Sequence, residues 1–282
     1  MRGTTEAIRA EKLVKAFGRI TALAGVSLEV AWGETLGILG DNGAGKSTLI
    51  KILTGYHQPD SGQVFVEGRP VQLASVDDAR ALGIECVYQD LALVNGLSIY
   101  HNMFLNRELL HWGPLKLLDH RAMRRRAAEA LDEIGVDVPS VELAVGALSG
   151  GQRQAIAVAR AVYSKARILL LDEPLAAMGA REARLIIGLI ERLRARGDIA
   201  IVMIAHNYAQ TLEICDRVIL MQHGEITFES TTAATSAAEL LDIVRREYRT
   251  ARVLSCVVSE PVVGSVTPKA CSRNSPDAIF GR

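Results

Sequence analysis

Hydrophobic positions in this chain form short continuous runs, separated by stretches with a helical period. The runs Ile168–Leu171 and Ile199–Ala205 are apolar throughout, as expected for strands that are buried on both faces. Thr35–Leu39 predicts another strand, and Lys46–Leu53 predicts the start of a helix shortly after it. Alternating strands and helices favour an α/β fold in which helices cover a mostly parallel sheet.

The residues from about 91 to 162 interrupt this alternation and indicate a helical insertion. Met123, Ala127 and Leu131 recur at helical spacing, and Asp119 is placed to cap the amino end of that helix. Three arginines at positions 124–126 occupy the other side of the helix. A solvated helix face explains them more simply than a site for phosphate or lipid headgroups.

Toward the carboxyl end, Ser236 and Glu239 form a capping box ahead of an apolar stretch, which predicts a last helix that ends near Tyr248. After Thr250, serine, valine, proline and glycine dominate without a sustained period. We therefore expect a folded domain over residues 1–248 and a loose tail over residues 249–282.

Composition and charge narrow the classes of function. The chain has 32 Lys and Arg residues against 32 Asp and Glu residues, which argues against a broad electrostatic surface for nucleic acid. No apolar run approaches the length of a membrane span, and Met1–Glu6 lacks the apolar core of a secretory signal. The four cysteines lack the spacing of metal ligands and indicate reduced thiols in a cytosolic chain. At a membrane, a partner would have to supply the spanning part.

A glycine loop follows the predicted strand at Thr35–Leu39 and matches the pattern G-x-x-x-x-G-K-[ST]. It comprises Gly40, Asp41, Asn42, Gly43, Ala44, Gly45, Lys46, Ser47 and Thr48. The glycines let backbone N–H groups converge on phosphate oxygens, Lys46 can reach the β- and γ-phosphates, and the Ser47 hydroxyl can ligate Mg²⁺. The alternative is a glycine-rich turn that only caps a helix, but the flanking strand and helix favour phosphate binding.

Two further motifs follow in the order Leu148-Ser149-Gly150-Gly151-Gln152 and Asp172-Glu173-Pro174. With the glycine loop they make the chain, from about Ile8 to about Phe228, resemble the ATP-binding-cassette (ABC) ATPases. The resemblance implies a P-loop NTPase cassette with a RecA-like parallel-sheet core, an N-terminal antiparallel β portion and an inserted helical subdomain. The chain has no internal repeat, which indicates a single cassette.

The resemblance assigns roles to residues at two strand ends. Asp172 closes an apolar strand and would hold Mg²⁺ opposite Ser47. Glu173 turns toward a different face and would polarise the water that attacks ATP. His206 follows the run that ends at Ala205, as does the family histidine that contacts the γ-phosphate. A lone histidine is more often structural, but this placement favours the functional interpretation.

Two other residues match family positions outside these strands. Gln89 lies between a β-like run and the helical insertion, and it resembles the glutamine that senses Mg²⁺ and water and links to the membrane partner. Phe17 matches the aromatic residue that stacks on adenine, a role for which only the π-face is needed. The alternative for Phe17 is a place in the core.

Leu148–Gln152 predicts a helix start whose N–H groups and positive end attract an anion. In the family, Ser149, Gly150, Gly151 and Gln152 would close on ATP that is held by the opposite subunit. The resemblance therefore implies a homodimer in which two copies sandwich two ATP molecules head to tail. An isolated monomer is then expected to hydrolyse ATP poorly.

One position departs from the common pattern, because Gly179 stands where many relatives have an aspartate that helps to couple the two sites. The same departure occurs in bacterial monosaccharide importers of the ribose/xylose/fructose type, which Leu97–Leu105 and Ala205–Tyr208 also resemble. The implied protein is an ATP-hydrolysing subunit on the cytoplasmic face of the inner membrane. Its implied partners are a second copy, a multi-span permease and, through the permease, an extracytoplasmic sugar-binding protein.

Other functions remain open at this point. The same cassette could energise transport of a solute that is not a sugar, or act without transport as ABC proteins on ribosomes or DNA do. Those soluble proteins usually carry two cassettes or long coiled-coil insertions, and this sequence has neither. An inactive binding module is disfavoured because Lys46, Asp172, Glu173 and His206 are all present.

Overall fold

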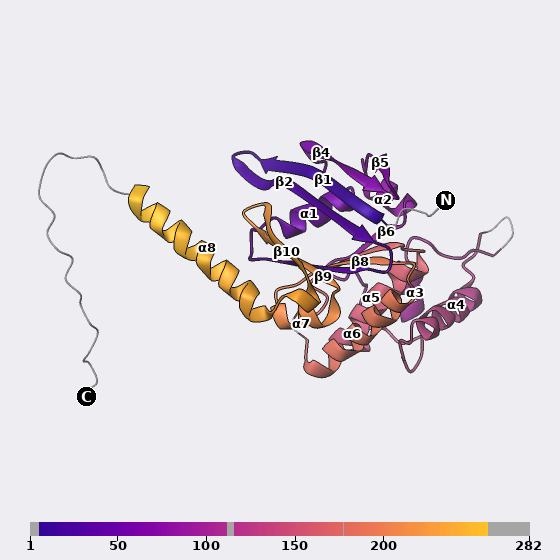
Figure 1. Ribbon diagram of the computed structural model, residues 1–282. Coiled ribbons are helices and arrows are strands. Elements are labelled where there is room, and N and C mark those ends of the chain that lie inside the picture. Colours follow the sequence, from indigo (N-terminus) through magenta and orange to yellow (C-terminus); the bar gives the residue numbers. More distant parts are fainter. Residues whose placement is uncertain (1–5, 112–115, 177, 259–282) are drawn as a thin grey trace, which may run out of the picture. The chain divides into compact units, whose positions relative to one another are not determined.

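The computed structural model describes residues 6–111, 116–176 and 178–258 (Figure 1). The chain divides into two units, Met1–Leu240 and Leu241–Arg282, and the first contains every candidate site residue. Within the described residues, no helix combines the length and the apolar character needed to cross a membrane.

Two sheets organise the first unit. A four-stranded antiparallel sheet has the order β2-β1-β4-β5, and a six-stranded sheet has the order β10-β9-β3-β8-β7-β6. In the larger sheet β9, β3, β8, β7 and β6 are parallel, and β10 is antiparallel at one edge. The strands are β1 (Glu6–Phe17), β2 (Ile20–Ala31), β3 (Thr35–Leu39), β4 (Ser61–Val66), β5 (Arg69–Val71), β6 (Ile84–Val87), β7 (Ile168–Asp172), β8 (Ala200–Ile204), β9 (Arg217–Gln222) and β10 (Glu225–Thr231).

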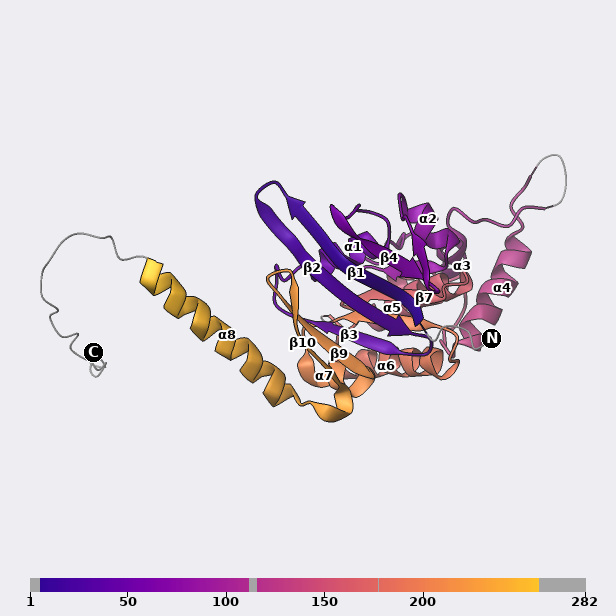
Figure 2. The same ribbon diagram turned by 45° about the horizontal axis from the view of Figure 1, so that its top comes forward.

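The helices follow the α/β order that the sequence predicts. They are α1 (Lys46–Leu53), α2 (Val76–Ala81), α3 (Ile99–Phe104), α4 (His120–Glu133), α5 (Gly150–Tyr163), α6 (Ala180–Ala195), α7 (Tyr208–Ile214) and α8 (Ala237–Val258), with 3₁₀ turns at Val145–Ala147 and Thr232–Ala234. Helix α1 lies between the two sheets and contacts β2 and β7 (Figure 2). On the other side of the larger sheet, α7 contacts β3 and β9, and α5 contacts β6.

The core is built from strands that are buried on both faces, which confirms the interpretation of the continuous apolar runs. Ile38, Leu170 and Val202 belong to a cluster shared with α1 and the antiparallel sheet. Their chain neighbours Leu169 and Ile201 point to the opposite face, because side chains alternate along a strand, and are also 0% exposed. The interior positions of the central strands β3, β7 and β8 therefore had to be apolar on both faces.

Three local predictions can be compared with the structure. Helix α4 is capped as expected, since the Asp119 carboxylate accepts a hydrogen bond of 2.8 Å from the Ala122 N–H. The Ser236 hydroxyl likewise accepts a hydrogen bond from the Glu239 N–H. The expected end of the last helix near Tyr248 is wrong, because α8 continues to Val258. Residues 259–282, the remainder of the expected tail, lie outside the described residues.

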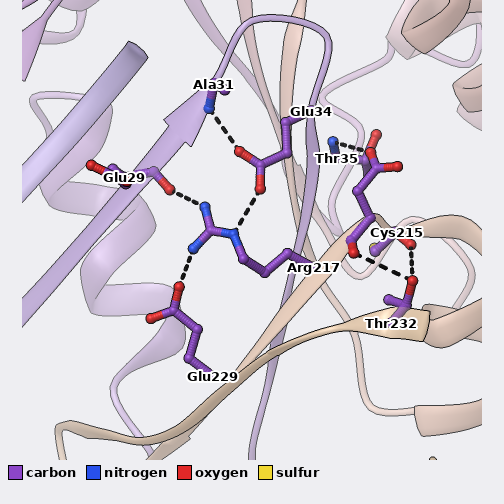
Figure 3. A network of polar contacts seen from close by, with 9 residues as sticks. Glu29, Ala31, Glu34, Thr35, Cys215, Arg217, Glu229 and Thr232 are labelled. Carbon is purple, nitrogen blue, oxygen red and sulfur yellow. Dashed lines mark hydrogen bonds and ion pairs between the residues drawn. The ribbon is translucent and has the colours of Figure 1, made fainter. Parts of the chain in front are cut away.

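An ion-pair network joins the two sheets through Arg217 of β9 (Figure 3). Its guanidinium donates a hydrogen bond of 2.8 Å to Glu34, another to the backbone oxygen of Glu29 on β2, and pairs with Glu229 on β10. The Glu34 carboxylate in turn accepts a hydrogen bond of 2.7 Å from the Ala31 N–H. Because Arg217 and Glu34 side chains are only 18% and 16% exposed, water replaces lost partners poorly here.

We expect Arg217→Ala to lower the free energy of unfolding by about 2 kcal/mol, because it removes the hydrogen bonds of a partly buried charge. Urea unfolding followed by circular dichroism measures the change. Arg125→Ala is the matched control, since the Arg125 side chain is 68% exposed and its ion pair, at 3.7 Å, is with Glu129 of its own helix. Equal losses for the two variants would contradict a role for the network in joining the sheets.

Candidate functional site

The register of the parallel strands brings the glycine loop, Asp172, Glu173, His206 and the segment with Gln89 to one edge of the larger sheet. Ile38 of β3 pairs with Ile204 of β8, and Ile204 also pairs with Asp172 of β7. Leu171 of β7 pairs with Val87 of β6. The segments that leave β3, β8, β7 and β6 therefore begin beside one another, and ligands of open α/β sheets bind at this carboxyl edge.

The glycine loop joins β3 to α1 and encloses the Lys46 side chain. Lys46 Nζ donates hydrogen bonds of 2.6 Å to the Gly40 oxygen and 2.9 Å to the Asp41 oxygen. Burial lowers the pKa of Lys46, although Glu173, Asp41 and Asp172 oppose that shift. Gly40 has φ +143°, and a Cβ there would lie 2.2 Å from the Met221 oxygen, so no other residue fits this conformation. A cationic group is thus held on backbone oxygens within the glycine loop, where its charge fits a bound phosphate.

A carboxylate and an imidazole meet just beyond β7 and β8. His206 Nε2 lies 2.6 Å from Glu173 Oε1, and the Glu173 N–H donates to the Ile204 oxygen at 3.1 Å. Glu173 has φ +53°, a left-handed conformation that costs a non-glycine residue energy and that the surrounding contacts must hold in place. A cavity of about 310 Å³ adjoins this pair, with walls that include Met178, Asn207 and Gln210.

Asp172 is the second carboxylate at this edge and ends β7. Burial raises the pKa of Asp172, and the nearby negative charge of Glu173 raises it further, against the opposing effect of Lys46. A half-buried carboxylate in this position fits a bound cation, which would relieve the cost of its charge. Ser47, an exposed residue in the first turn of α1, supplies a hydroxyl of the type that Mg²⁺ accepts.

Gln89 and Phe17 lie on the two flanks of this arrangement. Gln89 is exposed in the bend that follows β6. Phe17 ends β1 and is 44% exposed, so it is not a core residue, and its ring meets that of His57 edge-on at 5.3 Å. The β1–β2 hairpin that carries Phe17 reaches the glycine loop, because a Cβ on Gly45 would lie 2.4 Å from the Ala22 oxygen.

The turn Ser149–Gln152, which we call the signature turn, starts α5 as predicted and contacts α6. The Ser149 hydroxyl accepts a hydrogen bond from the Gln152 N–H, and the Gln152 side chain accepts one from the Ser149 N–H, so the two form a capping box. Gly151 packs on Glu182, and a Cβ there would lie 2.8 Å from the Glu182 Cβ. The glycine is therefore required by helix packing as well as by any ligand.

Sequence reasoning missed two residues that hold the segment after Gln89. Arg160 of α5 donates hydrogen bonds of 3.0 and 2.9 Å to the backbone oxygens of Leu91 and Ala92. Asn102 is fully buried, accepts a bond of 2.7 Å from the Val94 N–H and donates one of 3.1 Å to the Val94 oxygen. An asparagine beside the apolar residues Met103 and Phe104 was a weak signal for Asn102, but no local pattern gives the distant partner of Arg160.

The glycine loop, together with the acidic residues at a neighbouring strand end, defines a nucleotide-binding protein of the P-loop class. The chain belongs to the ABC transporter family, whose profile matches residues 23–176, and it is an ATP-binding, ATP-hydrolysing cassette of that family. It is 44% identical over 230 residues to "Xylose/arabinose import ATP-binding protein XylG" of Sulfolobus acidocaldarius, which covers 82% of this chain and 90% of that protein. It is 43% identical to "Fructose import ATP-binding protein FrcA" of Rhizobium meliloti over 77% of this chain and 85% of that one.

The ribose-type relatives are longer proteins. "Ribose import ATP-binding protein RbsA" of Chromobacterium violaceum is 37% identical, and the match covers 80% of this chain but 44% of that protein. Among solved structures, the ADP conformation of MJ1267, an ATP-binding cassette of an ABC transporter, has a TM-score of 0.74 and 26% identity. It matches 91% of this chain and 100% of that one. The expected ABC cassette fold is confirmed.

We expect Asp172→Asn to raise the free energy of unfolding at pH 7 by about 1 kcal/mol, because it removes a desolvated charge. The pKa of Asp172 is raised in the folded state above its ordinary value of 3.8. Asp172 therefore makes its full favourable contribution to the free energy of unfolding below pH 3.8, where the carboxyl group is protonated. The contribution is lost as pH rises, so the advantage of the variant shrinks on acidification. Urea unfolding at pH 7 and pH 4 checks this, with exposed Asp198→Asn as the control; an equal gain at both pH values would contradict it.

Proposed function

We propose that the chain is the ATP-hydrolysing subunit of a monosaccharide importer. The proposed role in ATP hydrolysis rests on the hydrogen-bonded pair of Glu173 and His206, which lies beside the glycine loop that holds Lys46. The import part is supported by the identity with xylose/arabinose and fructose import proteins over nearly their full lengths. The functional cassette spans residues 1–248 in this proposal, with residues 91–162 as its helical insertion.

Each side chain of the site has a task in the hydrolysis of ATP. The amides of Gly40–Thr48 and the charge of Lys46 hold the phosphates, and Phe17 offers its exposed ring face to adenine. Ser47 and Asp172 would hold Mg²⁺ with help from Gln89, and that ion would neutralise charge that builds up on the phosphate oxygens. Glu173 orients and polarises the attacking water, while His206 holds the Glu173 carboxylate in place and faces the γ-phosphate.

The signature turn completes the site of a second copy. Ser149, Gly150, Gly151 and Gln152 begin a fourteen-residue helix, whose positive end suits a phosphate. The solved cassette MJ0796, 25% identical with a TM-score of 0.67, is described as dimeric and bound to ADP and Pi. A head-to-tail homodimer with two ATP molecules between the copies follows by analogy. Gly179 stands in place of the aspartate that helps to couple the two sites in many relatives, so strict coupling between the sites is not part of this proposal.

Transport requires that closure of the dimer moves a membrane partner. Arg160 fixes the backbone after Gln89 to the helix that begins with the signature turn, so movement of α5 reaches the surface from Gln89 to Asn106. A multi-span permease docked on that surface would place the cassette on the cytoplasmic face of the inner membrane. The permease would receive its sugar from an extracytoplasmic binding protein, and nucleic acid has no part in this function.

Glu173→Gln is expected to lower the rate of ATP hydrolysis by about a hundredfold or more, because a carboxamide fills the same space but polarises water poorly. The variant is also expected to retain ATP and to accumulate as a dimer, which size-exclusion chromatography with light scattering detects. Lys46→Ala is the contrasting variant and should form no ATP-dependent dimer, because it removes a phosphate-binding charge. Hydrolysis by Glu173→Gln at the parent rate would remove Glu173 from its proposed role.

The importer function is tested by purification of the tagged chain from its own cell membranes in mild detergent, with mass spectrometry of the associated proteins. We expect a multi-span permease and a sugar-binding protein, and both should be recovered equally with Glu173→Gln, which preserves the docking surface. Recovery of ribosomal or nucleic-acid proteins without a permease would overturn the transport function and favour a soluble ATPase.

A further inference from the structure

We propose that the carboxylate of Glu182 takes the anion-binding position of the signature turn in the isolated chain and yields it to the γ-phosphate of ATP held by a second copy. Glu182 would thereby set the ATP concentration at which the dimer closes. The inference rests on the proposed head-to-tail dimer and adds a residue that the family motifs do not contain.

The position of the carboxylate carries this inference. Glu182 Oε1 accepts a hydrogen bond from the Gly151 N–H at 3.5 Å, and Glu182 Oε2 accepts one from the Gly179 N–H at 3.4 Å. A Cβ built on Gly150 would lie 3.8 Å from Glu182 Oε1, so the same carboxylate also fronts the first residue of α5. An anion that belongs to the chain itself therefore covers the amides to which we assign the γ-phosphate.

A carboxylate and a phosphate cannot both use the Gly151 N–H. Their charges would repel within a few ångströms of each other, and one N–H donor satisfies one close acceptor. The hydrogen bonds from Gly151, Gly179 and Ser149 lower the pKa of Glu182, so its charge is present at neutral pH. Entry of the phosphate thus requires Glu182 Oε1 to withdraw.

Withdrawal of Glu182 Oε1 costs little free energy because the two carboxylate oxygens accept hydrogen bonds from the starts of two different helices. The bond of 3.5 Å to Gly151 is at the weak end of the hydrogen-bond range. Oε2 remains available to Gly179 at the start of α6, where Glu182 is the third residue of the helix and accepts the N–H of the residue before it. Gly179 offers only its backbone N–H here, so the carboxylate rather than a side chain at position 179 links the two helix starts.

The test compares Glu173→Gln with the double variant Glu173→Gln/Glu182→Gln. Glutamine removes the charge, and its side-chain oxygen still suits the Gly179 N–H, so α6 keeps its first turn. We expect the ATP concentration for half-maximal dimer, measured by light scattering, to fall about threefold to fivefold, since a charge at a helix start is worth up to about 1 kcal/mol. The difference should shrink in 0.5 M salt, because screening weakens the competing charge.

Glu173→Gln/Glu191→Gln is the matched control, because Glu191 is an exposed glutamate farther along α6. It should leave the half-maximal concentration unchanged, and thermal unfolding should show that all three proteins are folded. A half-maximal concentration that is unchanged or raised in the Glu182 variant would overturn the inference while leaving the dimer in place. Failure of Glu173→Gln itself to dimerise with ATP would overturn the proposed dimer and the inference together.

Discussion

The pairing of β3, β8, β7 and β6 is the constraint on which the rest of this molecule depends. These strands are parallel and in register, so the glycine loop, His206, Asp172 and the Gln89 segment all leave the sheet at one edge. None of these groups is near another in sequence. A parallel arrangement also obliges every crossover to run outside the sheet, which is why helices cover both faces and why the interior positions of β3, β7 and β8 are apolar.

Two charged side chains at this edge are desolvated by burial, and bound substrate would stabilise their charges. Lys46 is buried with its ammonium on backbone oxygens, and Asp172 is half-buried next to a second carboxylate. Burial opposes the charged form of both groups, so the protein alone is not their best environment. Phosphates bring negative charge to Lys46, and a divalent cation would bring positive charge to Asp172. The site is thus less stable by itself than a neutral edge would be, as expected of a working site.

Much of this could be predicted from the sequence, because local patterns carried it. Continuous apolar runs identified β7 and β8, Asp119 identified the start of α4, and the glycine loop identified the strand and helix on either side of it. The end of α8 was missed because the composition change after Thr250 signals a loop, whereas the helix continues to Val258. The partners of Arg160, Arg217 and Glu182 could not be predicted, since each contact joins elements that are distant in sequence and depends on the finished packing.

The left-handed backbone at Glu173 has a consequence for how such genes change after duplication. A glycine at that position would relax the backbone and remove a charge from beside Asp172, so the disabled copy would be the more stable one. Selection for a stable fold therefore favours glycine at this position, whereas selection for ATP hydrolysis favours glutamate. A copy released from hydrolysis would lose its carboxylate with little resistance while keeping its phosphate loop, and would then bind nucleotide without turning it over.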